Sequence, residues 1–522
     1  MNFSTCEWLN SRIDHPAELK GVGIGSFDAD YQVNGGSSFT DLNIGIQALK
    51  DLNPKFFISV SGSNQFIRNQ IGIRINGGEL HKIVDGNNFE LNPSTAIPVN
   101  LGNPTVFGIV NTGSTKITVK GNTFDGKVLN MPQNTSKYGF NSDNTVSASF
   151  HLNNTFTKLF MGEQTQRDNT GLNLYCNTHL LYTNSWRVFG KLGDQGKCGF
   201  LQINNITPDD KFNVPCLGTQ LNHINSYTTN PFTYWIKPSD PEQPNCNSTK
   251  VSKSTCNSFP PPAGGCTFIV PDIIPGNVVE YRTQIDGMDD GPFKSVIINE
   301  LLRYYFKNNL TEDADNLLAT QTSVDNKFTR AMLLLDQGNF SGATAVINSI
   351  PSNSDEKADM ITFFNVISVA KQSNISMTNL SESAIASLES ITDNRTLGAY
   401  SAQALLTAFY DHQYPIVLET EDGLQYRSNS EPDKDQIVKD SYMSIDPSPI
   451  DDICMIKFGL IEKLINAKIR IYSIEGILLD EVSISSPVNQ VKLDSKLWPS
   501  AVFTAVLIND NKIVVSLKSV KN

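Results

Sequence analysis

One pattern occurs twice near the start of the chain, as Ser38-Phe39-Thr-Asp-Leu-Asn-Ile44-Gly45-Ile46 and as Gln65-Phe66-Ile-Arg-Asn-Gln-Ile71-Gly72-Ile73. In both stretches a Phe precedes an Ile-Gly-Ile by the same number of residues. Later copies are degenerate, but each keeps a Phe after a turn that contains Asn. The recurring aromatic residues lie 23 to 35 residues apart, at Phe39, Phe66, Phe89, Phe124 and Phe156. A repeat of this length is typical of a solenoid.

A right-handed parallel β-helix accounts best for residues 1–186. One coil of such a helix has two or three short strands, and its inward Ile and Phe side chains stack on the equivalent residues of the next coil. Gly fits the sharp turns, and Asn tolerates a left-handed bend. The wording "G-I-x-I … N-x-F" resembles the repeats of pectate-lyase-like surface proteins, which implies the same fold here. A β-sandwich, the alternative, would give similar alternation but not the repeated offset between Phe and Gly.

A cysteine-rich segment follows, and we expect residues 187–270 to form a cap that covers the open end of the solenoid. An even number of cysteines in a loop-rich stretch predicts disulfides and an oxidising compartment. A metal site is the alternative, but there is no C-x-x-C and no pair of His at ligand spacing. We therefore predict disulfides among Cys176, Cys198, Cys216, Cys246, Cys256 and Cys266, and free thiols at Cys6 and Cys454.

The periodicity then changes from that of strands to that of helices. Apolar residues recur at i, i+3 and i+4 in residues 296–306 and in later segments. This pattern predicts a small bundle of three to five antiparallel helices within residues 271–415. Residues 416–440 are polar and rich in Asp and Glu, a composition typical of a flexible acidic linker.

The last segment, residues 441–522, has short alternating runs separated by Gly, Pro, Asn and Asp, which predict a small antiparallel β-sandwich. It includes Asp446-Pro-Ser-Pro449 and Ile469-Arg-Ile-Tyr-Ser-Ile-Glu-Gly476. These motifs resemble the type A C-terminal sorting domain of the Bacteroidetes type IX secretion system. The resemblance implies an Ig-like sandwich that acts as an export tag. The residues at the motif positions are Pro447, Pro449, Ile471, Tyr472, Gly476, Pro499, Phe503 and Lys518.

Two positions depart from that family, since Ala501 stands for a Gly and Phe503 for a Tyr. A generic Ig-like accessory module is the alternative. The resemblance implies a secreted or outer-membrane-attached protein, with the type IX secretion machinery as its partner. The first eight residues lack the basic and apolar regions of a secretory signal, so we expect an incomplete copy of the gene product.

Composition excludes two classes of partner. A net charge of −12 without a basic run argues against nucleic acid. No apolar run approaches 18 residues, so we expect no transmembrane segment.

Motifs for chemistry are missing from the sequence. There is no Gly-x-Ser-x-Gly and no P-loop, and the six His are scattered. Acidic residues of the repeats, such as Asp28, Asp30 and Asp51, suit turns at least as well as a Ca²⁺ site or a pair of catalytic carboxylates. We therefore predict no catalytic residue, no metal and no cofactor.

The combined prediction is a mainly β, multidomain, exported protein of the cell surface or medium, non-enzymatic and adhesin- or glycan-binding-like. Tyr234 and Trp235 are candidates for stacking on a sugar ring, and packing in the core of the cap is the alternative for both. The alternative function is a carbohydrate-active enzyme of the β-helix type, either a polysaccharide lyase or a glycoside hydrolase.

Overall fold

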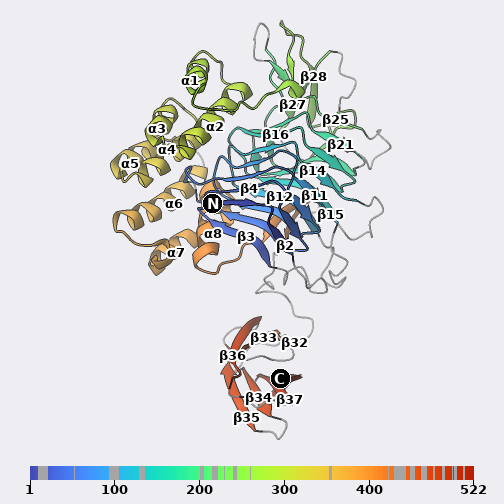
Figure 1. Ribbon diagram of the computed structural model, residues 1–522, viewed down its shortest axis with the longest axis vertical. Helices are drawn as coiled ribbons and strands as arrows, with labels where there is room; N and C mark the ends of the chain where they lie inside the picture. Colours follow the sequence, from blue (N-terminus) through green and yellow to red (C-terminus); the bar gives the residue numbers. More distant parts are fainter. Residues whose placement is uncertain are drawn as a thin grey trace. The chain divides into compact units, whose positions relative to one another are not determined.

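The computed structural model divides into two compact units, residues 1–429 and 430–522, which are described separately below. Strands dominate both units, and α-helices follow the strands of the first unit (Figure 1). No helix in the described part of the chain is long and apolar enough to cross a membrane. The described part is the whole chain apart from residues 10–20, 52, 93–104, 128–135, 181, 200–204, 214–221, 229, 239–243, 259, 352–354, 421–422, 428–441, 447–452, 460–466, 474–476, 485–487, 497, 499–501, 510–511 and 522.

Three long parallel sheets form the body of the first unit, and each coil contributes one strand to every sheet, except the last coil, which contributes one strand each to sheets 2 and 3. Sheet 1 contains β1 (Asn2–Ser4), β4 (Tyr31–Asn34), β7 (Ile58–Ser61), β10 (Lys82–Val84), β13 (Thr118–Lys120), β16 (Ser149–Leu152) and β20 (Leu172–Tyr175). Sheet 2 contains β2 (Glu7–Leu9), β5 (Ser38–Thr40), β8 (Gln65–Ile67), β11 (Asn88–Glu90), β14 (Thr123–Asp125), β17 (Thr155–Thr157), β21 (Thr178–Leu180) and β25 (Lys211–Phe212). Sheet 3 contains β3 (Val22–Phe27), β6 (Ile44–Leu49), β9 (Ile71–Asn76), β12 (Thr105–Thr112), β15 (Ser136–Asp143), β18 (Met161–Gln166), β22 (Asn184–Val188) and β26 (Asn222–Ser226). This arrangement is compatible with a parallel β-helix.

The recurring phenylalanines form one continuous stack along the inside of sheet 2. Their ring centroids lie 4.6 to 4.8 Å apart, and the ring planes are within 10° of parallel. Trp8 extends the stack at one end at 4.4 Å, and His179 extends it beyond Phe156 at 4.9 Å. The predicted stacking of equivalent residues is therefore confirmed. The spacing follows from the distance between neighbouring strands of a sheet.

The repeated glycines have a different role from the one predicted. Gly45, Gly72 and Gly108 lie within strands of sheet 3 and not at sharp turns. A Cβ atom on Gly72 would lie 2.6 Å from the carbonyl oxygen of Gly108 and 2.7 Å from the ring of Phe89. The offset between Phe and Gly is therefore repeated because each aromatic ring fills the space that a glycine leaves on the facing sheet.

A second stack, of buried asparagines, lies beside the aromatic one. In each case the side-chain amide nitrogen donates to the side-chain oxygen of the asparagine one coil further on. Asn154 Oδ1 also accepts from the backbone N–H of Asn122 at 3.0 Å. The left-handed bend lies one residue earlier, at positions such as Ser63 (φ 62°) and Gly121 (φ 69°). The predicted tolerance of Asn for the bend is therefore wrong for these asparagines, which instead satisfy buried backbone groups. The members of the stack are Asn64, Asn87, Asn122, Asn154 and Asn177.

The stacked sheets extend past residue 186, the predicted end of the solenoid, because β25 and β26 continue sheets 2 and 3. Short parallel pairs flank this end, and all of their strands except β19 lie within the predicted cap. These pairs are β19 (Asp168–Asn169) with β23 (Lys191–Leu192), β24 (Ile206–Thr207) with β29 (Ala263–Gly264), and β27 (Phe232–Ile236) with β28 (Val251–Thr255). The predicted cap therefore continues the coils.

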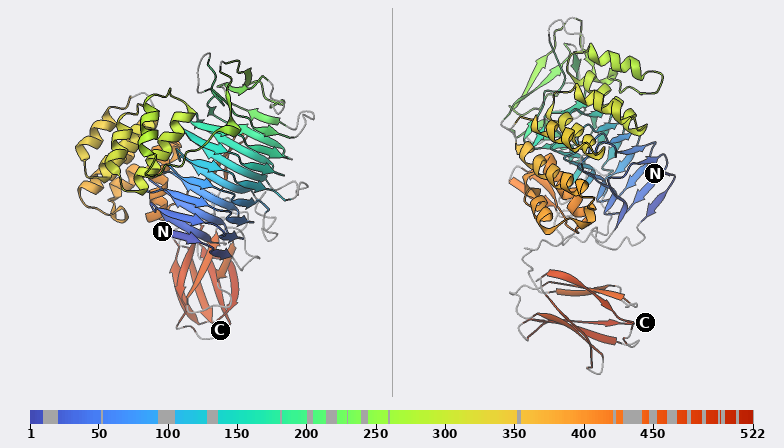
Figure 2. Two further views of the ribbon diagram at one scale, coloured as in Figure 1. Left: turned by 45° about the horizontal axis from the view of Figure 1, so that its top comes forward. Right: turned by 90° about the vertical axis from the view of Figure 1, so that its left-hand side faces the viewer.

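The helices lie along one side of the stacked sheets (Figure 2). Apolar residues of α2, among them Leu301 and Leu302, share a buried cluster with Leu80 and Phe150 of the first unit's coils. The predicted separate helical domain is wrong in this respect, because the helices and the sheets belong to one compact unit. The helices are α1 (Val278–Asp286), α2 (Pro292–Lys307), α3 (Thr311–Ala319), α4 (Val324–Asp336), α5 (Phe340–Asn348), α6 (Asp355–Gln372), α7 (Glu382–Glu389) and α8 (Leu397–Phe409), with short 3₁₀ turns at Gly265–Thr267, Met377–Asn379 and Thr392–Asn394.

An antiparallel hairpin occupies the first part of the predicted acidic linker. It consists of β30 (Ile416–Thr420) and β31 (Gly423–Arg427). Ile416 and Leu418 are 2% and 1% exposed because they pack on the outer face of sheet 3. The prediction of a flexible linker is therefore wrong for this part, because two apolar side chains of the acidic stretch pack on buried apolar residues of sheet 3. Residues 428–440 of the predicted linker lie outside the described residues.

The second unit consists of two antiparallel sheets that enclose one apolar cluster. Ile456 and Phe458 of one sheet share this cluster with Ile469, Ile471 and Leu507 of the other. One sheet has the order β32 (Tyr442–Asp446), β33 (Ile453–Gly459) and β36 (Val488–Asp494). The other has the order β35 (Leu478–Ser483), β34 (Lys468–Ser473), β37 (Val502–Asn509) and β38 (Lys512–Val520).

Candidate functional site

Buried charges join the helices to sheet 1. The Lys116 ammonium group lies 3.1 Å from Glu79 Oε2 and 3.2 Å from Asp325 Oδ2, and it donates to Thr329 Oγ1 at 3.0 Å. Burial alone would lower the pKa of Lys116, but the two carboxylates raise it above its usual value. Since the ammonium group has three protons, all of them are used inside the chain. This cluster therefore holds α4 against the sheet and leaves no proton of the Lys116 ammonium group for a ligand.

A cavity of about 280 Å³ lies beside this cluster, between the start of α2, the loop before α4 and the turn at residues 146–148. Its floor includes Lys116 and Asp325, which pair with each other. At its rim, Lys294 Nζ lies 3.0 Å from Asp290 Oδ1. No aromatic side chain lines it. The cavity offers hydrogen-bonding groups but no unbalanced charge and no surface for ring stacking.

The structure brings together two of the acidic residues of the repeats, Asp28 and Asp51. The backbone N–H of Asp51 donates to Asp28 Oδ1 at 3.1 Å. Burial, and then the charge of Asp51, raise the pKa of Asp28 well above its ordinary value. Burial raises the pKa of Asp51 as well. Burial also lowers the pKa of the neighbouring Lys50 to about 8. Shifts of this kind are common at catalytic centres, but Lys50 is 0% exposed and Asp51 is 7% exposed, so a polymeric substrate cannot reach them.

Another polar network lies inside the coils. Glu163 Oε1 lies 2.8 Å from His151 Nδ1, and its second oxygen lies 3.7 Å from His179 Nε2. The indole N–H of Trp186 donates to the same His179 nitrogen at 3.2 Å. Burial lowers the pKa of His179 to about 3, so this ring is neutral at physiological pH. All four side chains are at most 2% exposed, so the network stabilises the interior and has no access to a ligand.

Metal binding gains no support from the residues that the structure describes. Among them, no group of three or more His, Cys, Asp or Glu side chains could hold a metal ion.

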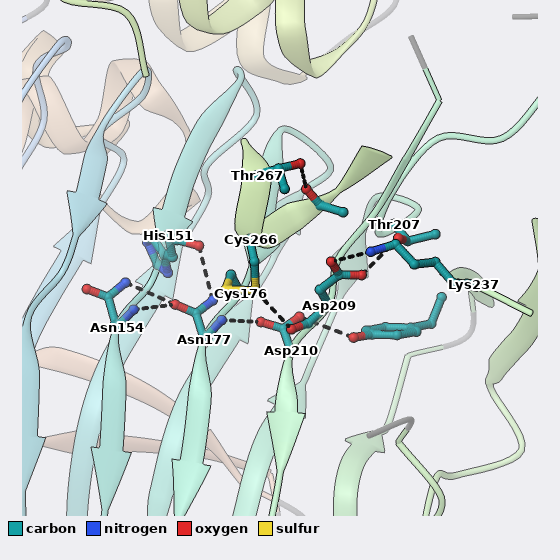
Figure 3. The surroundings of a disulfide bond; sticks show 12 residues. His151, Asn154, Cys176, Asn177, Thr207, Asp209, Asp210, Lys237, Cys266 and Thr267 are labelled. Carbon is teal, nitrogen blue, oxygen red and sulfur yellow. Dashed lines mark hydrogen bonds and ion pairs between the residues drawn. A yellow bond between two sulfur atoms is a disulfide. The ribbon is translucent and has the colours of Figure 1, made fainter. Parts of the chain in front are cut away.

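Disulfides lie at the end of the coils, and Figure 3 shows one of them, between Cys176 and Cys266. Cys176 pairs with Cys266, and Cys198 pairs with Cys256. Cys246 is also disulfide-bonded, while Cys216 lies outside the described residues. Cys6 and Cys454 are free, which confirms the predicted thiols.

The Cys176–Cys266 bond joins the last coils to the segment that leads into the helices. The bond lies next to Asn177, whose backbone N–H donates to Asp210 Oδ1 at 2.7 Å, at the end of the asparagine stack (Figure 3). Because its two cysteines are 90 residues apart in the sequence, this disulfide restricts a long loop of the unfolded chain.

The two aromatic candidates have different environments. Tyr234 is 1% exposed and packs on Trp186 at 5.7 Å, so it cannot stack on a sugar, and its prediction as a binding residue is wrong. Strand alternation in β27 gives Trp235 the opposite direction, and its side chain is half-buried. The core of the cap thus needs one of the two rings and leaves the other at the surface.

Sequence reasoning missed a second exposed aromatic residue, Tyr227. Its ring is 38% exposed and stacks on Phe189 at 4.8 Å. The amide of Asn225 donates to its hydroxyl oxygen at 2.6 Å. Arg187 lies behind the ring, 5.8 Å from its centroid. The only signal for this residue in the sequence is the run Asn225-Ser-Tyr227 after an apolar residue. Many surface strands have such a run, so it does not indicate a binding site.

The motif residues of the second unit belong to its core and its last strands. Ile471 and Phe503 are 1% and 2% exposed, and Phe503 packs on Trp498 at 5.5 Å. Tyr472 is half-buried, and Lys518 is exposed on β38. Four of the predicted motif residues lie outside the described residues: Pro447, Pro449, Gly476 and Pro499.

Similarity to known proteins was tested in three ways. Protein-family models, curated proteins and solved structures gave no match.

Proposed function

We propose that this chain is an exported, non-enzymatic binding protein of the cell surface or medium. Its body is a right-handed, pectate-lyase-like β-helix that binds an extracellular glycan with side chains on its outer surface. Residues 441–522 form an Ig-like sorting domain that the type IX secretion machinery of a Bacteroidetes cell recognises.

The observation that carries this proposal is the filled interior of the coils. Stacked aromatic rings, asparagines and the Glu163 network occupy the space between the sheets. The charges at the helix junction are paired within the chain. A ligand therefore meets only the outer surface, where Trp235 and Tyr227 offer rings for stacking on a sugar.

Two further features support an extracellular location. Disulfides persist in oxidising compartments, and the first unit has two pairs with both partners described. The second unit is compact by itself, as a domain with a separate recognition role would be.

A glycan-binding screen tests the binding function. The full chain is applied to immobilised glycans, and the strongest ligand is then titrated against Trp235→Ala and Tyr227→Ala. Loss of one stacked ring should weaken binding about tenfold or more. Tyr304→Ala, at a half-buried tyrosine on α2, serves as the control and should bind normally. Equal binding by all variants would contradict a role for these two rings.

A reporter fusion tests the location separately. Residues 441–522 are fused behind a secretory signal and a reporter and expressed in a bacterium with type IX secretion. The reporter should reach the cell surface or medium. Retention of the fusion in the periplasm would refute the sorting function and leave the glycan result unaffected.

A carbohydrate-active enzyme remains the second candidate because Asp28, Asp51 and Lys50 lie close enough to feel each other's charges and have shifted pKa values. A lyase or hydrolase would release unsaturated products or new reducing ends from acidic and neutral polysaccharides. Asp51→Asn would abolish that release. We expect no release from the unaltered chain, since the group is buried.

A further inference from the structure

Strand β30 is bound to the body of the first unit in an unusual way. Its backbone pairs with that of β31, and side chains from sheet 3 make further contacts to its backbone. Gln166 Nε2 donates to the carbonyl oxygen of Val417 at 2.9 Å, and Gln166 Oε1 accepts from the backbone N–H of Glu419. One side-chain amide thus makes the donor and acceptor contacts that a neighbouring strand would make.

Two more side chains repeat this type of contact. Gln164 Nε2 donates to the carbonyl oxygen of Glu419 at 3.2 Å, and Arg74 Nη2 donates to that of Tyr414 at 2.8 Å. All of these bonds go to backbone atoms, so they recognise an extended chain whatever its sequence.

Apolar contacts add the requirement for particular side chains. Ile416 and Leu418 are two residues apart, so both point to the same side of an extended strand. They pack on a row of outward residues of sheet 3, which we call the strand-binding face: Ile44, Ile71, Phe107, Tyr138 and Met161. Backbone hydrogen bonds combined with contacts to alternate side chains are the usual means by which proteins bind an extended peptide.

The hairpin leaves part of the hydrogen-bonding capacity beneath it unused. Asn141 pairs in register with Gln164 and is 0% exposed, yet neither its amide nitrogen nor its amide oxygen has a hydrogen-bond partner among the described residues. Gln164 Oε1 also lacks a partner in the described part. Buried amides without partners cost stability, so β30 is an imperfect occupant of this face.

We propose that the strand-binding face is a docking site for an extended segment of another protein, with apolar side chains two residues apart, and that β30 occupies this site in the free chain. A partner segment that also satisfies Asn141 and Gln164 would displace the hairpin. The displaced hairpin lies immediately before the residues that lead to the second unit. The proposal does not depend on the glycan-binding or export functions.

A peptide-binding experiment tests the proposal. The probe is a fluorescent peptide with the sequence of residues 414–420, and its anisotropy is measured with the full chain carrying Ile416→Ser and Leu418→Ser. These substitutions release the hairpin and leave the strand-binding face intact, so the peptide should bind with a Kd in the micromolar range. The unaltered chain should bind at least tenfold more weakly, because its own β30 competes.

Two controls make the result specific. Gln166→Ala on the double-variant background should weaken binding at least tenfold, whereas Gln65→Ala, in sheet 2, should leave it unchanged. A peptide with Ser in place of Ile416 and Leu418 should not bind. Equal binding by the two peptides, or by the Gln166→Ala chain, would overturn the proposal.

A second measurement covers the case in which the double variant does not fold. Excess peptide is added to the unaltered chain, and hydrogen exchange of the Glu419 amide is followed. Exchange should accelerate as β30 is displaced, and unchanged exchange at saturating peptide would overturn the proposal. Doubling of the double variant's mass without peptide would assign the face to a second copy of the chain and would also overturn it.

Discussion

The ring of Phe124 packs directly against Gly108, because a Cβ atom on Gly108 would lie 2.5 Å from Cδ1 of that ring. The same hypothetical atom would lie 2.5 Å from the carbonyl oxygen of Gly139 in the next coil. Both neighbours are part of continuous stacks, so neither can move alone.

Gly108→Ala should therefore destabilise the first unit by about 2–3 kcal/mol or more, in the upper range for overpacked cores. Urea unfolding followed by circular dichroism measures the change. Gly25→Ala is the matched control, because its Cβ would meet only Val22 Cγ1 at 3.8 Å. The control should change stability by less than about 1 kcal/mol. Similar decreases in the free energy of unfolding for both variants would show that the Phe124 ring does not restrict the residue at position 108.

The thiol content can be counted with Ellman's reagent. Without reductant, the denatured chain should show two thiols, Cys6 and Cys454. In the native chain at pH 8, only Cys6 should react quickly, because Cys454 is 0% exposed and burial raises its pKa to about 11. Four or more thiols in the denatured chain would disprove the disulfide framework.

Asp28 should make stability depend on pH. Its pKa in the folded state is raised, mainly by burial and then by the charge of Asp51. A raised carboxyl pKa gives a contribution that is fully present below the unfolded value and is lost as pH rises through the folded value. Asp28→Asn keeps an oxygen for the Asp51 N–H but carries no charge.

This variant should melt about 2 °C or more above the unaltered chain at pH 8, and the difference should shrink toward pH 4. Differential scanning calorimetry across this range gives the comparison. The exposed Asp272→Asn is the control and should show no such trend. A variant that is less stable at pH 8 would mean that Asp28 is needed as the counter-charge of Lys50.

Lys521 should be essential for the second unit. Lys521 is 8% exposed. Its ammonium group donates to the carbonyl oxygens of Ser495, Lys496 and Trp498 at 2.5, 3.3 and 3.1 Å. Lys521→Met leaves these carbonyls without the donor and should cost about 2–4 kcal/mol.

Hydrogen exchange of residues 502–509 in the full chain measures this loss. Lys518→Met, at an exposed lysine of β38 three residues before Lys521, is the control and should exchange like the unaltered chain. Unchanged exchange in Lys521→Met would indicate that the three contacts contribute little to folding.

The sequence predicts the features that repeat. The Phe spacing identifies the coils and the stack, because each coil meets an equivalent neighbour. The sequence also identifies the cysteine cluster, by its composition, and the strands of the second unit, by their alternation. Those predictions need only local patterns and a period.

Features that depend on contacts between distant segments could not be predicted. Nothing local indicates that Lys116 pairs with Asp325, about 200 residues later, or that Ile416 finds a place on sheet 3. The direction of Tyr234 and Trp235 also depends on which face of β27 meets the core. For the same reason the exposed Tyr227 was missed and the buried Tyr234 was selected.

The asparagine stack has a direction and a defined end. Each amide nitrogen gives a proton to the next coil, as Asn154 gives one to Asn177 at 3.1 Å, and the last position is held by Asp210. The side chain of Asp210 has no amide nitrogen that could bind a further asparagine, and burial raises the pKa of its carboxyl group well above the ordinary value. The asparagine series therefore ends at Asp210, where an oxygen stands in place of the amide nitrogen that each earlier member donates to the next coil.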